Sequence, residues 1–237
     1  MISVEGLEKR YGKIPAVRGI SFTVDAGEIV GLLGRNGAGK TTTLQCLAGI
    51  TRPDAGVVRL GGATMRDAPL DVKRRLAFIP DEPEFFNYLT VEEHVAFFRQ
   101  LYAGATELDP DPLHTYGLDE KREAFPDELS RGMRQKLALA CMLWRQADAL
   151  LFDEPLTGLD PSGIEEVKAI IRSRAAAGAA VLLSSHLLHL VRELCSRVLV
   201  LELGVLAANE PIASSAPSLP EDLERFFRAP EPGMPAR

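Results

Sequence analysis

The segment 34–41, which reads GRNGAGKT, places the strongest constraint on the fold of this chain. It matches the pattern G-x-x-x-x-G-K-[ST], in which glycines let backbone amides turn inward around phosphate groups. An apolar run, 29–33, precedes the segment, and residues 41–50 follow it with apolar side chains at helical spacing. A strand, a glycine-rich turn and a helix in this order predict an α/β fold with phosphates at the helix N-terminus.

Individual residues of this segment have distinct expected roles. Lys40 is expected to reach the outer phosphates, and Thr41 to offer its hydroxyl to Mg²⁺. The other candidate nucleotide ligands are the loop residues and the next helix residue, namely Gly34, Arg35, Asn36, Gly37, Ala38, Gly39 and Thr42. A glycine-rich turn without a ligand is the simpler interpretation, but few chance matches would also lie between a strand and a helix.

Two carboxylates follow a second apolar run, 149–152. Asp153, at the end of the expected strand, is suited to hold Mg²⁺ or its water shell. Glu154 points elsewhere and is suited to polarise a water for attack on a γ-phosphate. An acidic pair after a strand is more often a helix cap or a solvated turn, but the phosphate loop upstream favours the catalytic interpretation.

These two features resemble those of P-loop nucleotidases, and a third motif narrows the resemblance. Residues 129–135 read LSRGMRQ, which closely resembles the signature of ABC ATPases, usually LSGGQ. The chain departs from that signature at Arg131 and Met133. In the family, the signature binds the γ-phosphate of ATP held by the opposite protomer, so the resemblance implies this role for Ser130 and Gly132.

Further family elements occur in the expected order between residue 1 and about residue 210. Tyr11 resembles the aromatic residue that stacks on adenine. Gly158-Leu159-Asp160 resembles the D-loop, and Asp160 is a candidate ligand. His186 resembles the switch histidine at the γ-phosphate. Taken singly, each has an ordinary structural interpretation, but a joint coincidence is remote.

One position departs from the family in a way that bears on the chemistry. After the expected strand 76–79, the family has a glutamine that contacts Mg²⁺ or the attacking water, whereas this chain has Asp81. A carboxylate accepts hydrogen bonds but does not donate them as an amide does, so Asp81 is a candidate for holding a Mg²⁺-bound water. A register shift of one residue would give this role to Glu82.

The domain organisation follows from these patterns. The resemblance implies a P-loop nucleotidase core with N-terminal antiparallel strands, formed by 1–83 and 150–210, and an inserted helical subdomain, 84–149. Within the subdomain, Thr90 and Glu93 form a capping box, and a second helix is expected to begin near Ser130. The tail 211–237 holds six of the 16 prolines and is expected to be loosely ordered, apart from a turn at 221–228.

Composition excludes several classes of function. The net charge of −6 disfavours a general nucleic-acid binder, which needs a basic surface. No apolar run approaches the roughly 20 residues of a membrane span, and no secretory signal is recognisable, so we expect a cytoplasmic protein. Three dispersed cysteines, Cys46, Cys141 and Cys195, are typical of reduced, buried thiols.

The resemblance implies an ATPase that drives transport, using ATP and Mg²⁺. Two chains would bind two ATP molecules head to tail, and a separate transmembrane permease would hold the subunit at the inner face of the membrane. The permease is expected to dock beside Phe85, Phe86 and Tyr88. The alternative interpretation is that these aromatic side chains are buried within the helical subdomain. The signature form and the short C-terminal end resemble those of exporters.

Two other classes of function share some of these features. A soluble ABC protein that acts on ribosomes or DNA usually has paired cassettes or a long coiled coil, whereas this chain has one cassette, no sustained heptads and an acidic balance. A small-molecule phosphotransferase would share the phosphate loop, but the signature and His186 oppose it.

Overall fold

Two β-sheets organise the computed structural model, which describes residues 1–186 and 188–212. The smaller sheet is antiparallel with the order β2-β1-β4, formed by β1 (Ile2–Tyr11), β2 (Ile14–Val24) and β4 (Ala55–Leu60). The larger sheet has the order β5-β6-β7-β3-β8-β9, formed by β3 (Ile29–Leu33), β5 (Leu76–Ile79), β6 (Ala149–Asp153), β7 (Ala180–Ser184), β8 (Arg197–Glu202) and β9 (Val205–Pro211). Its strands are parallel except β9, which is antiparallel to β8.

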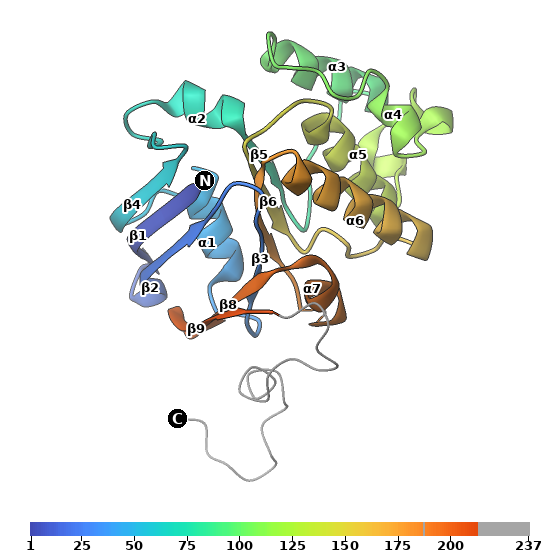
Figure 1. Ribbon diagram of the computed structural model, residues 1–237. Coiled ribbons are helices and arrows are strands. Elements are labelled where there is room, and N and C mark those ends of the chain that lie inside the picture. The colour runs from blue at the N-terminus through green and yellow to red at the C-terminus, as the bar shows by residue number, and fades with distance from the viewer. Residues whose placement is uncertain (187, 213–237) are drawn as a thin grey trace.

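Helices cover the larger sheet and extend beyond its β5 edge (Figure 1). In chain order they are α1 (Lys40–Leu47), α2 (Pro69–Arg75), α3 (Val91–Leu101), α4 (Pro112–Thr115), α5 (Arg131–Leu143), α6 (Pro161–Ala176) and α7 (Leu188–Leu194), with short 3₁₀ turns at Asp119–Lys121 and Pro126–Glu128. Figure 1 shows α3, α4 and α5 grouped at one end of the molecule, between β5 and β6 in the chain.

The central strands are buried on both faces, as their continuous apolar sequences predict. Along β3, Val30 and Leu32 pack into a core shared with α1 and the smaller sheet. Ile29 and Leu33 pack into a second core, shared with α5 and α6. Alternate residues of each strand therefore belong to different cores, which fixes the register of the sheet.

Most of the expected elements are confirmed, although their ends differ. The larger-sheet strands expected at 29–33, 76–79 and 149–152 are present. The two N-terminal strands are longer than their apolar runs, because pairing in a hairpin extends them over polar residues as far as Tyr11. The helix expected over 41–50 ends at Leu47, and the turn 221–228 lies outside the described residues.

The predicted helix starts and cysteine states are also confirmed. The Glu93 N–H donates to the Thr90 hydroxyl at 3.2 Å, and the Thr90 N–H donates to the Glu93 carboxylate at 2.8 Å. Ser130 caps α5 by accepting a hydrogen bond from the Met133 N–H at 3.3 Å. The three cysteines are buried and free. None of the helices in 1–186 and 188–212 has the length and apolarity needed to cross a membrane.

A buried arginine attaches the end of this helical region to the larger sheet. Arg145 is 1% exposed, and its guanidinium donates to the carbonyls of Arg74 at 2.7 Å and Leu76 at 2.6 Å. The same guanidinium lies 3.8 Å from the centre of the Tyr102 ring. These contacts fix the chain just after α5 against the beginning of β5.

A buried histidine holds the loop that precedes α3. His94 is fully buried, its Nδ1 donates to the Thr90 carbonyl at 2.7 Å, and its Nε2 accepts a hydrogen bond from the Phe86 N–H at 3.0 Å. The acceptor role of Nε2 requires the neutral ring with the proton on Nδ1. Burial lowers the pKa of His94, because a charged ring would lose its hydration.

Stability is therefore expected to fall as the pH drops below about 6.5, where the unfolded chain protonates this histidine and the folded chain does not. His94→Gln keeps a donor and an acceptor without the titration. Between pH 7.5 and 5.5, the free energy of unfolding of the variant should decline less steeply than that of the wild type. The difference between the two slopes should be at most about 1.4 kcal/mol per pH unit. Urea unfolding across this range measures both slopes, and equal slopes would contradict the prediction.

Candidate functional site

The loop 34–41 connects β3 to α1 with a backbone that two glycines make possible. Gly34 has φ 153° and Gly39 has φ 106°. A Cβ atom at Gly34 would lie 2.5 Å from the Leu201 carbonyl oxygen, and one at Gly39 would lie 2.5 Å from that of Ala16. Larger residues would therefore displace β8 or β2 from the loop.

The lysine and threonine of the loop lie at the start of α1. Lys40 is 8% exposed, and its ammonium donates to the Gly34 carbonyl at 2.8 Å, so it lies across the loop. Thr41 is exposed and Thr42 is partly exposed on the first turn, while Arg35, Asn36 and Gly37 are exposed along the loop and Ala38 is buried. A buried ammonium beside free helix amides is suited to bind an anion.

Asp153 ends β6 and is 2% exposed. Its carboxylate accepts a hydrogen bond from the Ser184 hydroxyl at 2.5 Å, and the two residues are paired in the register of β6 and β7. The Ser184 hydroxyl in turn accepts a hydrogen bond from the Glu154 N–H at 3.0 Å. One buried serine therefore orients both acidic residues.

Glu154 and His186 form a hydrogen-bonded pair. Glu154 has φ 49°, a left-handed conformation that is uncommon outside glycine. Its Oε2 lies 2.9 Å from Nδ1 of His186. Because a carboxylate only accepts, Nδ1 of His186 carries the proton of this hydrogen bond.

Strand order brings these groups together. β7 lies between β6 and β3, with Ser184 paired to Asp153 on one side and to Leu32 on the other. The loop 34–41, the two acidic residues and His186 therefore meet at the carboxyl edge of three adjacent parallel strands, where ligands bind in open α/β sheets. Tyr11 ends β1 and is 50% exposed, with the Lys9 ammonium 5.6 Å from its ring centre.

A second group of candidate residues surrounds the start of α5. A Cβ atom on Gly132 would lie 2.4 Å from the Gly158 carbonyl oxygen, so the signature turn and the segment 158–160 are in direct contact. Asp160 is the N-cap residue of α6. A hydrogen bond from the Ser162 hydroxyl at 2.6 Å holds the pKa of Asp160 below its usual range. Across 1–186 and 188–212, no recorded hydrogen bond or ion pair joins these residues to the first group.

Asp81 contacts this second group. Its carboxylate lies 3.0 Å from Nη2 of Arg131, and Glu82 beside it is exposed. Asp81 and Arg131 are both positions at which this chain has a charged residue and the family pattern has an uncharged one. These two charged residues are paired with each other. This ion pair was not predictable from either position alone, because the two residues are 50 apart in the chain.

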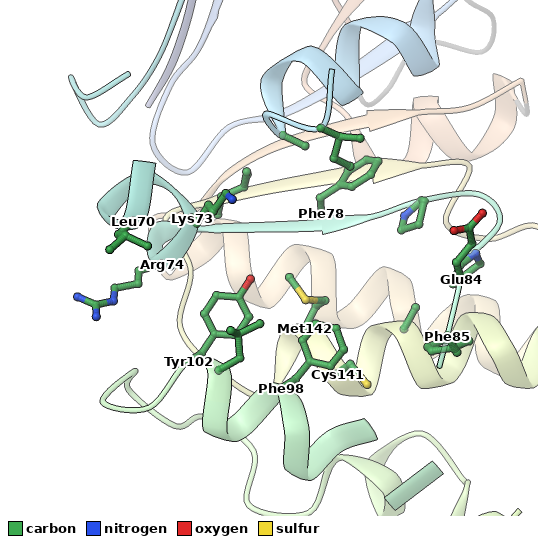
Figure 2. Close-up of a pocket in the computed structure, with 17 residues that line it drawn as sticks. Leu70, Lys73, Arg74, Phe78, Glu84, Phe85, Phe98, Tyr102, Cys141 and Met142 are labelled. Atoms are coloured by element: carbon green, nitrogen blue, oxygen red, sulfur yellow. The ribbon is translucent and has the colours of Figure 1, made fainter. Parts of the chain in front are cut away.

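An apolar groove of about 530 Å³ lies between α2, β5, α3 and α5. Figure 2 shows Phe98 and Tyr102 opposite Phe78, with Met142 between them. The groove has charged residues at its rim, namely Lys73, Arg74 and Glu84.

Of the three aromatic residues expected at a partner surface, Phe85 lines this groove. Phe86 is 40% exposed and Tyr88 is 73% exposed, and their rings lie 5.6 Å apart. Neither of these two exposed rings lines the groove itself.

The donor set fits a metal that binds mainly through a nucleotide. Among the described residues, no group of three or more His, Cys, Asp and Glu side chains is placed to hold a metal ion. The Thr41 hydroxyl and the Asp153 carboxylate offer oxygen ligands on α1 and β6. Mg²⁺ typically takes one or two such protein ligands and completes its coordination with phosphates and water.

Sequence reasoning missed Ser184 as a functional residue. It is fully buried and bonded to both acidic residues. The available signal was the hydroxyl of Ser184 directly after an apolar run, 180–183, and two residues before His186. That signal becomes informative only once β7 is known to lie beside β6.

Comparisons with known proteins agree on one family. A family model described as "ABC transporter" matches residues 17–157. The Nod factor export ATP-binding protein I of Burkholderia lata is 38% identical over 220 residues, which cover 91% of this chain and 71% of that protein. The ABC-type transporter ATP-binding protein EcsA of Bacillus subtilis is 31% identical over 213 residues, which cover 88% of this chain and 86% of that protein.

Solved structures lead to the same family. The structure of an ATP-binding subunit of an ABC transporter matches with a TM-score of 0.84 and 30% identity, covering 96% of this chain and 93% of that chain. A dimeric ATP-binding cassette bound to ADP and Pi matches with a TM-score of 0.79 and 22% identity, covering 90% of this chain and 99% of that chain. At this lower identity the likeness shows the fold alone.

The contact between Gly132 and Gly158 predicts a position-specific effect of alanine. Gly132→Ala should lower the free energy of unfolding by about 1–3 kcal/mol, because its Cβ would meet a backbone oxygen. Gly163→Ala is the matched control, because its Cβ would meet, at 2.9 Å, a side-chain oxygen of Asp160 that can move. Urea unfolding of both variants measures the difference, and equal stabilities would refute the steric explanation.

Proposed function

This chain belongs to the ABC transporter family, and we propose that it is the ATP-hydrolysing subunit that powers export through a separate membrane permease. The chain binds ATP and is an ATPase, as the family is. The observation that carries the proposed site is the meeting of loop 34–41, Asp153, and the Glu154–His186 pair at the ends of three adjacent strands.

The proposed roles follow from charge and hydrogen-bonding capacity. Lys40 and the amides of loop 34–41 bind the phosphates, with Lys40 exchanging its carbonyl partner for phosphate oxygens. Glu154 accepts the proton of the attacking water and orients it, while His186 donates from Nδ1 to keep that carboxylate aligned. Tyr11 is proposed to stack on the adenine ring. It is 50% exposed at the end of β1, so its ring is accessible to a ligand.

Mg²⁺ is proposed as the ion that accompanies ATP, held by Thr41 and Asp153. When bound there, Mg²⁺ would supply positive charge that offsets the negative charge of the phosphate oxygens. Ser184 fixes the Asp153 carboxylate through its 2.5 Å hydrogen bond. Asp81 is also proposed to act through a Mg²⁺-bound water, with Glu82 as the alternative residue. In the structure, the Asp81 carboxylate is paired with Arg131.

A second ATPase subunit is proposed to complete the site. Ser130 and Gly132 lie beside the segment 158–160 that contains Asp160, and this group suits binding to ATP held by an opposite subunit in a head-to-tail dimer. The dimeric cassette with the same fold supports this arrangement. ATP would then lie between two chains, each contributing a phosphate loop and a signature turn.

The apolar groove between α2, α3 and α5 is the proposed docking surface for the permease. Its apolar lining, with Phe85 and Phe98, suits a short apolar segment of a partner. Docking there would hold the subunit against the cytoplasmic face of a membrane. Export is proposed because the Burkholderia lata relative is named as an export protein.

Glu154→Gln tests the hydrolytic site. ATP should still bind, because loop 34–41 is unchanged, while phosphate release should fall by about two orders of magnitude or more. Phosphate release and nucleotide binding are measured on the same sample. Glu5→Gln, on the smaller sheet, is the matched control and should retain wild-type turnover. Undiminished hydrolysis by Glu154→Gln would remove this residue from the mechanism.

Ser184→Ala tests the buried hydroxyl. Its loss leaves Asp153 without a donor and is expected to reduce kcat by about tenfold or more, with a higher Mg²⁺ requirement and a smaller effect on ATP affinity. Titration of Mg²⁺ at saturating ATP separates these effects. Ser184→Thr retains the hydroxyl and should recover part of the activity. Wild-type kcat and Mg²⁺ dependence in the alanine variant would limit Ser184 to packing.

A further inference from the structure

Helix α5 connects the two surfaces that the proposed function uses. Its N-terminal turn carries Ser130 and Gly132, which face the second subunit in that proposal. Its C-terminal half lines the apolar groove through Ala138, Cys141 and Met142. A displacement of α5 would therefore alter both surfaces at once.

The segment 80–85, which also lines the groove, is bound to the first turns of α5. Gln135 donates to the Pro80 carbonyl at 3.4 Å. Arg134 donates to the Pro83 carbonyl at 3.1 Å, and its guanidinium lies 5.5 Å from the centre of the Phe85 ring. These contacts involve the backbone or an aromatic face and do not require an acidic residue in the segment.

An ion pair between Asp81 and Arg131 also joins the segment 80–85 to the start of α5. Arg131 is the first residue of α5 and lies between Ser130 and Gly132 in the chain. Its Cγ and Cδ atoms lie 3.4 Å from the position that a Cβ atom on Gly158 would occupy, so its side chain passes over the segment 158–160 before reaching Asp81. The aliphatic part of the Arg131 side chain thus lies against this segment, and its guanidinium is paired with the Asp81 carboxylate.

We propose that Asp81 and Arg131 are a positioning pair that holds the signature turn in the arrangement that binds ATP across the dimer. The inference rests on the proposed composite site. The side chains are 38% and 54% exposed, and an exposed ion pair contributes little to global stability. Its effect is therefore expected in the assembly of the dimer rather than in unfolding.

The test measures Mg-ATP-dependent dimerisation of the full chain by light scattering in the Glu154→Gln background, which retains ATP. Asp81→Asn and Arg131→Gln should each raise the dimer dissociation constant by about tenfold, because each dimer contains the pair twice. The double variant should be no weaker than either single variant, since both remove the same interaction. Exchange of the charges, Asp81→Arg with Arg131→Asp, should restore part of the affinity.

Arg59→Gln is the matched control. It removes an exposed ion pair of similar length, 3.1 Å, between Arg59 and Glu5 on the smaller sheet, and it should leave the dissociation constant unchanged. Urea unfolding of every variant should give stabilities close to that of the parent, which separates loss of positioning from loss of folding.

Several results would overturn the inference. Unchanged dissociation constants, or additive losses in the double variant, would show that the two residues do not act through each other. A loss in Arg131→Gln with wild-type behaviour in Asp81→Asn would indicate that Arg131 contacts phosphate directly. If the Glu154→Gln parent formed no ATP-dependent dimer, the proposed composite site would fail, and this inference with it.

Discussion

Parallel pairing of β3, β7 and β6 is the constraint on which the proposed catalytic site depends. Ser184 lies in register with Leu32 on one side and with Asp153 on the other, so three chain segments distant in sequence end at one edge. These strands are buried on both faces, which limits their movement relative to one another. The positions of Lys40, Glu154 and His186 follow from this sheet rather than from contacts among themselves alone.

Local patterns predicted the parts of the site that short segments determine. The loop 34–41 was recognisable because its glycines, Lys40 and Thr41 must occur at fixed spacing between a strand and a helix. The capping box at Thr90 and the cap at Ser130 were predictable for a similar reason, since each involves residues three apart in the chain. The apolar runs of the central strands were equally informative because both faces are buried.

Contacts between distant segments were not predictable in the same way. Ser184 and Asp153 are 31 residues apart, and Arg131 and Asp81 are 50 apart, so neither pair has a sequence pattern. The full length of β1 is not evident from apolar residues, because hairpin pairing extends the strand over polar residues to Tyr11. Helix α2 was missed because its exposed residues, such as Leu70, give no strong apolar periodicity.

The attachment of the helical region has a mechanical consequence. The chain leaves the larger sheet after β5 and returns to it at β6, and these two strands are neighbours. A region connected to a sheet at two neighbouring points rotates most easily about the line that joins those points. Rotation about other axes is opposed by both connections. The returning segment is bound to the start of β5 through Arg145, and the outgoing segment is bound to α5 through Arg134. A force applied in the groove would thus act as a torque about the line that joins these two connections, and it would also move the N-terminal end of α5, which lies away from Arg145.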